Sequence, residues 1–247
     1  MAHDEGMVTS EEELEAARGY REGLLWLREA TSLETVQPRG QGSATPIGDK
    51  SFALIVEFEV SSKQVYERKY RHTIWPKEES GVTVGIGYDV GYATKIQLHA
   101  DWDGAISPQM IVALERALGV TGTKAGPLAR ELAALVDIPF DVALQVHRKK
   151  VIPRWVAIVE GALSNTHRLP AEALGALVSL TYNRGASFSK DGDRYKEMRN
   201  IKSHMQSGEF SRIPGDLRSM KRIWPTVPGL QSRREREAKL FEAALSA

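Results

Sequence analysis

The chain has 247 residues, of which 42% are hydrophobic and 26% are charged, and this fits a soluble globular protein of one large domain or two small ones. The absence of cysteine excludes disulfides, thiolate catalysis and Cys-ligated zinc. No apolar run approaches the roughly 20 residues of a membrane span, and no conventional signal peptide is expected. The net charge of +1 does not by itself indicate a strongly acidic or strongly basic partner.

The charge is nevertheless unevenly distributed. Residues 1–48 carry nine acidic and four basic side chains, a balance of −5, so residues 49–247 must carry +6. A mildly basic body suits a polyanionic target such as cell wall or nucleic acid, but it is also common in proteins that bind neither.

Three parts are predicted along the chain. Residues 1–36 form an acidic segment in which Ser10 and the following glutamates begin a helix. Residues 37–49 are rich in Pro, Gly and small polar residues and read as a linker. Residues 50–247 form the main domain. The acidic segment either packs back on this domain or serves as a docking segment.

The main domain is expected to begin with an amphipathic helix, followed by a glycine-rich strand or hairpin. Apolar residues alternate at Val82, Val84 and Ile86, which is the period of a strand. Glycine inside a strand usually marks a bulge or a close approach. The helix has one face that carries Phe52, Ile55, Val56, Glu59, Tyr66 and Tyr70. The glycines of the strand segment are Gly81, Gly85, Gly87 and Gly91.

The remainder is predicted to be helical. Ser107-Pro108 is a strong helix start, and Pro170 and Gly185 bound a further helix. One small β element in a helical body predicts an α+β, mostly α, fold. The expected helices cover residues 107–118, 126–136, 139–150, 152–163, 170–184, 193–206, 208–220 and 229–245.

Glu59 is the first candidate for chemistry. It lies on the apolar face of its helix, whereas Glu57 lies about 160° around the axis. Burial among apolar side chains raises the pKa of a carboxyl, and a glycosidase general acid requires this. The alternative is that Glu59 pairs with a core arginine or caps a backbone group.

Thr83 and Asp89 complete the candidate set. Glycines clear the space around Thr83, so its hydroxyl could orient a water, although most strand threonines are structural. Asp89 is either an ordinary turn residue or the carboxylate that activates water or stabilises an oxocarbenium-like centre. The sequence predicts no metal or cofactor: His99, Asp101 and Asp103 have the composition of a metal site but not its spacing.

Four blocks in order resemble phage-type lysozymes, the muramidases of glycoside hydrolase family 24, and their bacteriocin relatives. The blocks are Glu59 with Tyr66; Thr83-Val84-Gly85-Ile86-Gly87-Tyr88; Leu177 to Gly185; and Gly229-Leu230 with Arg233-Arg234 and Glu237. The third block, Leu177 to Gly185, is similar to the family's helix that ends in Phe-Asn-x-Gly.

The chain departs from the phage pattern at two positions. Lys77 stands six residues before Thr83, where the family carries Asp or Cys, and Tyr88 replaces the family's His. Asp89 stands six residues after Thr83, and this arrangement is similar to the pesticin-type branch.

The resemblance implies a lysozyme-like domain, with a small β element and a helical lobe around a substrate cleft. It implies hydrolysis of the β-1,4 bond between N-acetylmuramic acid and N-acetylglucosamine in peptidoglycan. Glu59 would protonate the leaving oxygen, and Asp89, helped by Thr83, would deprotonate water. Inversion and retention both stay open. The expected glycan-binding residues are Tyr88, Gly85, Gly87, Asn183 and Arg184.

A wall hydrolase without a signal peptide would be made in the cytoplasm and act in the periplasm or cell wall. It would be a phage endolysin released through a holin, or an effector carried by a secretion apparatus and matched by an immunity protein. Two alternatives remain: a catalytically inactive wall-binding or assembly module, and a chitinase- or chitosanase-like glycosidase. Nucleic-acid binding and stable membrane insertion are not expected.

Overall fold

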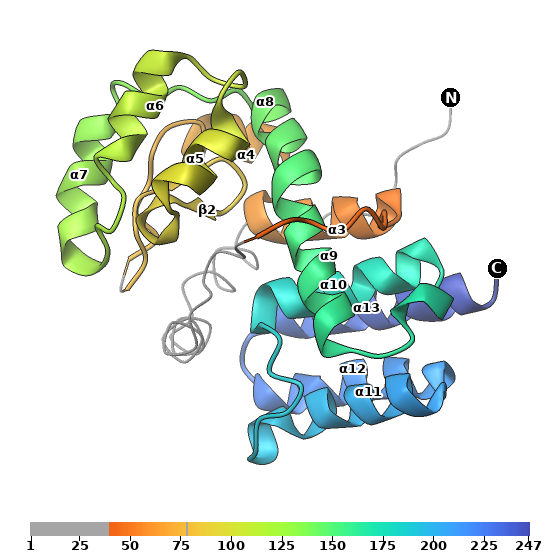
Figure 1. Cartoon of the computed structure of the whole chain (residues 1–247). Helices are drawn as coiled ribbons and strands as arrows, with labels where there is room; N and C mark the ends of the chain where they lie inside the picture. Colours follow the sequence, from red (N-terminus) through yellow and green to blue (C-terminus); the bar gives the residue numbers. More distant parts are fainter. Residues whose placement is uncertain (1–39, 78) are drawn as a thin grey trace.

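The computed structural model describes residues 40–247 except residue 78 (Figure 1). The helix expected over residues 10–35 therefore lies outside the described residues. The described part is mostly helical with one small antiparallel sheet, and this confirms the α+β, mostly α, fold class.

The helices and strands follow one another with short 3₁₀ turns between several of them. Their bounds are α3 (Asp49–Val60), α4 (Lys63–Lys69), β1 (Thr83–Val84), β2 (Tyr88–Asp89), α5 (Lys95–Trp102), α6 (Pro108–Glu115), α7 (Ala125–Leu132), α8 (Phe140–Val146), α9 (Ile152–Ala162), α10 (Ala171–Arg184), α11 (Lys196–Ser207), α12 (Ile213–Ser219) and α13 (Pro228–Leu245).

The two strands form a hairpin surrounded by α4 to α7, which we call the hairpin lobe (Figure 1). Thr83 pairs with Asp89 and Val84 with Tyr88. The turn between the strands, Gly85–Gly87, is called the hairpin tip. Gly85 and Gly87 have φ of +58° and +69°, a conformation that glycine adopts without steric cost.

A single rod that runs through α8 and α9 joins this lobe to the C-terminal helices (Figure 1). The sequence predicts two separate stretches here, but the structure joins them through a π-helical turn, His147–Val151. Pro153 explains the turn. It has no N–H to donate and would clash with the preceding turn of an α-helix, and a π-turn is one way to absorb this.

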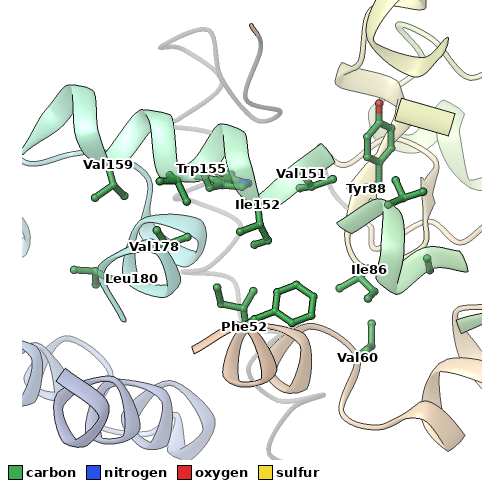
Figure 2. Close-up of a cluster of buried hydrophobic side chains, with 14 of the residues drawn as sticks. Phe52, Val60, Ile86, Tyr88, Val151, Ile152, Trp155, Val159, Val178 and Leu180 are labelled. Carbon is green, nitrogen blue, oxygen red and sulfur yellow. The ribbon is translucent and has the colours of Figure 1, made fainter. Parts of the chain in front are cut away.

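Helices α10 to α13 form the C-terminal lobe, in which α10 packs on α13, α3 and α9. The predicted ends of α10 are confirmed, since Pro170 precedes it and Gly185 follows with φ of +69°. Ser107 is confirmed as a cap of α6 because its hydroxyl accepts the Met110 N–H. Figure 2 shows side chains of α3, the hairpin, α9 and α10 meeting in one apolar cluster.

Two further expectations differ from the structure. The first helix of the domain is broken at Ser61, whose φ is +66°, so that α3 and α4 are separate. Part of the expected linker packs on the domain: the Ser43 N–H donates to the carbonyl of Pro153, and the Gly48 N–H donates to that of Ala171. The described residues of the expected linker are thus packed on the domain through Ser43 and Gly48. Within residues 40–247, residue 78 aside, no helix is long and apolar enough to cross a membrane.

Candidate active site

Glu59 lies one residue before the end of α3, where the two lobes meet. Its side chain is 19% exposed, and its Oε1 is 3.3 Å from Nη1 of Arg233 on α13. The pairing with a core arginine, which the sequence left as an alternative, is therefore present. Glu57, two residues earlier, pairs instead with Arg236 through both carboxylate oxygens.

Arg233 is buried and is the centre of a charged network inside the C-terminal lobe. Its guanidinium donates to the carbonyl and the hydroxyl of Ser179 on α10, at 3.1 and 3.2 Å. The Ser179 hydroxyl donates to Oε1 of Glu237 at 2.6 Å, and Arg234 donates to the same oxygen at 2.7 Å. This network leaves the Arg233 side chain little freedom, so it fixes the guanidinium that faces Glu59.

The hairpin tip reaches the other oxygen of Glu59. A Cβ added to Gly87 would lie 3.1 Å from Oε2 of Glu59 and 3.2 Å from the hydroxyl of Tyr182 on α10. The bare Cα of Gly87 is thus what allows the hairpin to approach the carboxylate. Glu59 consequently has one oxygen beside Arg233 and the other beside the hairpin tip.

Asp89 is held by the backbone of its own turn. The N–H groups of Gly81 and Gly91 donate to its two oxygens at 2.9 Å each, and the Tyr92 N–H also donates. The side chain is only 7% exposed. Burial raises the pKa of Asp89 to about 7, against the opposing effect of the three N–H groups. Asp89 therefore combines the turn role with an unusually weak acidity.

Thr83 lies directly opposite Asp89 in the sheet, so both side chains are on the same face. Its hydroxyl is 3.4 Å from the carbonyl of Gly81, to which it donates, and its backbone forms a bridge with Ile74. The structure thus brings Thr83 and Asp89 together at the base of the hairpin, while Glu59 lies at the tip. Lys77, in the turn before the hairpin, has φ of +83°.

Tyr88 and Gly85 do not occupy the places expected of glycan-binding residues. Tyr88 is 1% exposed, and its hydroxyl donates to Asp101, which also pairs with Arg154. This corrects the expectation, because a buried tyrosine engaged with Asp101 is unavailable to a ligand. Gly85 backs onto Trp102: a Cβ there would lie 3.0 Å from the indole ring.

Arg184 and Asn183 differ from each other. Arg184 is fully buried over the ring of Trp224, and burial lowers its pKa to about 9, so it is corrected to a packing residue. Asn183 is half-buried, but its Oδ1 is shielded from solvent and has no hydrogen-bond partner among the described residues. Asn183 and Gly87 are thus the two expected binding residues that keep some exposure.

The sequence did not single out Arg233 and Tyr182 as site residues. Both lie in the blocks that carry the resemblance, so their spacing was a usable signal. Their contacts with Glu59 and the hairpin tip depend on helix packing, which spacing does not show.

The three residues with the composition of a metal site do not come together as one. Among the residues that the structure describes, no group of three or more His, Cys, Asp or Glu side chains is arranged to hold a metal ion. His99 binds Asp103 and Glu115 in ion pairs, while Asp101 turns inward to Arg154. No protein family matches this chain, and no curated protein matches it either.

Proposed function

We propose that this protein is a peptidoglycan hydrolase that cleaves the β-1,4 bond between N-acetylmuramic acid and N-acetylglucosamine. The observation that carries the proposal is the meeting of the four sequence blocks around Glu59. Arg233 of the fourth block binds Glu59 of the first, and Gly87 of the second lies against Glu59. Tyr182 of the third block binds the carbonyl of Ile86.

In the proposed reaction, Glu59 gives a proton to the leaving glycosidic oxygen. Its Oε2 is the donor, because Oε1 faces Arg233 and Oε2 faces the bare hairpin tip. A water adds to the anomeric carbon, and its proton passes to Asp89 while Thr83 orients the water. A carboxylate with a pKa of about 7 is matched to this task, because general bases work best near the ambient pH.

The test is digestion of purified peptidoglycan by the wild type, Glu59→Gln and Asp89→Asn, with the products resolved by mass spectrometry. We expect new reducing-end muramic acid from the wild type alone. Glu57→Gln is the matched control, because Glu57 is a half-turn away on the same helix and pairs with Arg236. It should retain the wild-type product pattern. Full digestion by folded Glu59→Gln would overturn the proposal.

A non-catalytic wall-binding module is the second candidate. The backbone engagement of both Asp89 oxygens favours it, because an occupied carboxylate is a poor base. Binding of intact peptidoglycan by the wild type without any cleavage would establish this candidate. Cleavage of added chitin oligomers, without muramic acid products from peptidoglycan, would instead favour a chitinase- or chitosanase-like enzyme.

We further propose that residues 1–36 dock the protein to a secretion apparatus. The test is removal of residues 2–39, which spares the packed residues 40–48. We expect unchanged digestion of purified peptidoglycan and loss of delivery to target cells. Unchanged delivery would exclude the docking role and favour release as an endolysin.

A further inference from the structure

Tyr182 occupies a position at which the resembling lysozyme helix carries Phe, so its hydroxyl is a feature of this chain. The hydroxyl donates to the carbonyl of Ile86, in the hairpin tip, at 3.4 Å. It also lies 3.2 Å from the point where Gly87 would carry a Cβ, and Glu59 Oε2 lies 3.1 Å from the same point. The Tyr182 hydroxyl oxygen and Glu59 Oε2 are therefore no farther apart than the sum of their two distances from this point.

The ring of Tyr182 is held by two aromatic neighbours. His147 meets it edge-on with ring centroids 5.7 Å apart, and Trp155 lies at 5.0 Å. His147 belongs to the π-turn and is fully buried, and burial lowers its pKa to about 3, so the imidazole stays neutral. A ring packed on both partners keeps its hydroxyl at a constant place over the tip.

The hairpin tip needs such an anchor. Gly85 and Gly87 both have positive φ, and glycine has more backbone freedom than any other residue. A sheet of only two residue pairs constrains this turn weakly. Without a contact from α10, the distance from Gly87 to Glu59 would vary with the motion of the tip.

We propose that Tyr182 is a positioning residue, whose hydroxyl ties the hairpin tip to α10 and so sets the place of Gly87 against the Oε2 of Glu59. This inference rests on the proposed hydrolase function. In that reaction the glycosidic oxygen receives its proton between the hairpin tip and Oε2 of Glu59. Misplacement by a fraction of an ångström is enough to lower the rate of such a step.

Tyr182→Phe removes the hydroxyl and keeps the ring. We expect kcat to fall about tenfold while KM stays within about twofold, because the loss concerns geometry in the transition state. Amide hydrogen exchange over residues 85–88, measured without substrate, should become about tenfold faster as the tip loses its anchor. The control is Tyr66→Phe, which removes a buried hydroxyl that also donates to a backbone carbonyl, that of Ile138. It should leave both readouts unchanged.

The outcomes separate the two proposals. Wild-type kcat in Tyr182→Phe, or unchanged exchange at the tip, would overturn the positioning role. A wild type that never cleaves peptidoglycan would overturn the hydrolase function and the kinetic part of this inference, whereas the exchange would still decide whether the anchor exists. If Tyr182→Phe does not fold, Trp155→Phe loosens the ring and should move both readouts in the same direction, by less.

Discussion

Glu59 and Asp89 are two partly or fully buried carboxyl groups whose hydrogen-bond partners come from different parts of the chain. Glu59 is bound by a guanidinium that is 174 residues away in the sequence. Asp89 accepts hydrogen bonds from backbone N–H groups that are no more than eight residues away. The surroundings of a carboxyl group at the junction of two lobes thus depend on tertiary packing, whereas those of a carboxyl group in a turn depend on local backbone geometry.

The largest loss of stability should come from removing Arg233, the cation that binds Glu59. Arg233→Met leaves Glu59 and the buried Glu237 without this partner, and breaking a buried pair costs about 3–5 kcal/mol in the free energy of unfolding. Arg236→Met is the control. Arg236 also pairs with a carboxylate of α3, but its side chain is more exposed, and the cost should be about 1–2 kcal/mol. Urea unfolding measures both. Equal costs would mean that burial of the network adds nothing.

The effect of Asp89 should appear in the pH dependence of the free energy of unfolding. Because its folded pKa of about 7 is above the ordinary 3.8, the folded chain retains this proton longer than the unfolded chain. The contribution of Asp89 to stability is thus complete below pH 3.8 and is lost as the pH rises through 7. From about pH 4.5 to 6.5, the wild type should lose about 2.5 kcal/mol relative to Asp89→Asn. Parallel pH profiles of the two proteins would contradict this.

His147 should act in the opposite direction in an overlapping pH range. Its folded pKa of about 3 is below the ordinary 6.5, so its contribution is complete above pH 6.5 and is lost as the pH falls towards 3. Relative to His147→Leu, the wild type should gain about 2 kcal/mol from about pH 4.5 to 6.5. The two groups largely cancel in the wild type, so each variant exposes the other. The same slope in wild type and variant would show that His147 titrates normally.

The smallest effect tests the close approach of the hairpin tip. Gly87→Ala places a Cβ against Glu59 and Tyr182 in a left-handed conformation, whereas Gly104→Ala imposes a similar φ, +77°, in open space. The conformation alone should cost about 1–2 kcal/mol in both variants. Only Gly87→Ala should also lower peptidoglycan hydrolysis. Equal activity of the two variants would mean that the close approach of Gly87 to Glu59 does not contribute to hydrolysis.

The sequence predicted the local features well. The start of α6 at Ser107, the end of α10 at Gly185 and the hairpin at Thr83 follow from capping, glycine placement and strand period, which are short-range properties. It predicted two of the long-range features less well. The surroundings of Glu59 were expected to be apolar, and Arg184 was expected to face ligand. Their neighbours come from distant helices, and helical period alone does not identify them.

The number of residues in the π-turn also sets how the two lobes are rotated relative to each other. Residues 140–162 form one uninterrupted rod, and the π-turn accommodates one residue more than a regular α-helix of the same rise would. Each residue of an α-helix turns the chain by about 100°. Inserting one further residue among Arg148, Lys149 and Lys150 would therefore swing α9, and the Trp155 that it carries, around the rod relative to α8. The hairpin lobe and the C-terminal lobe would then be out of phase, although every helix in each of them could still form.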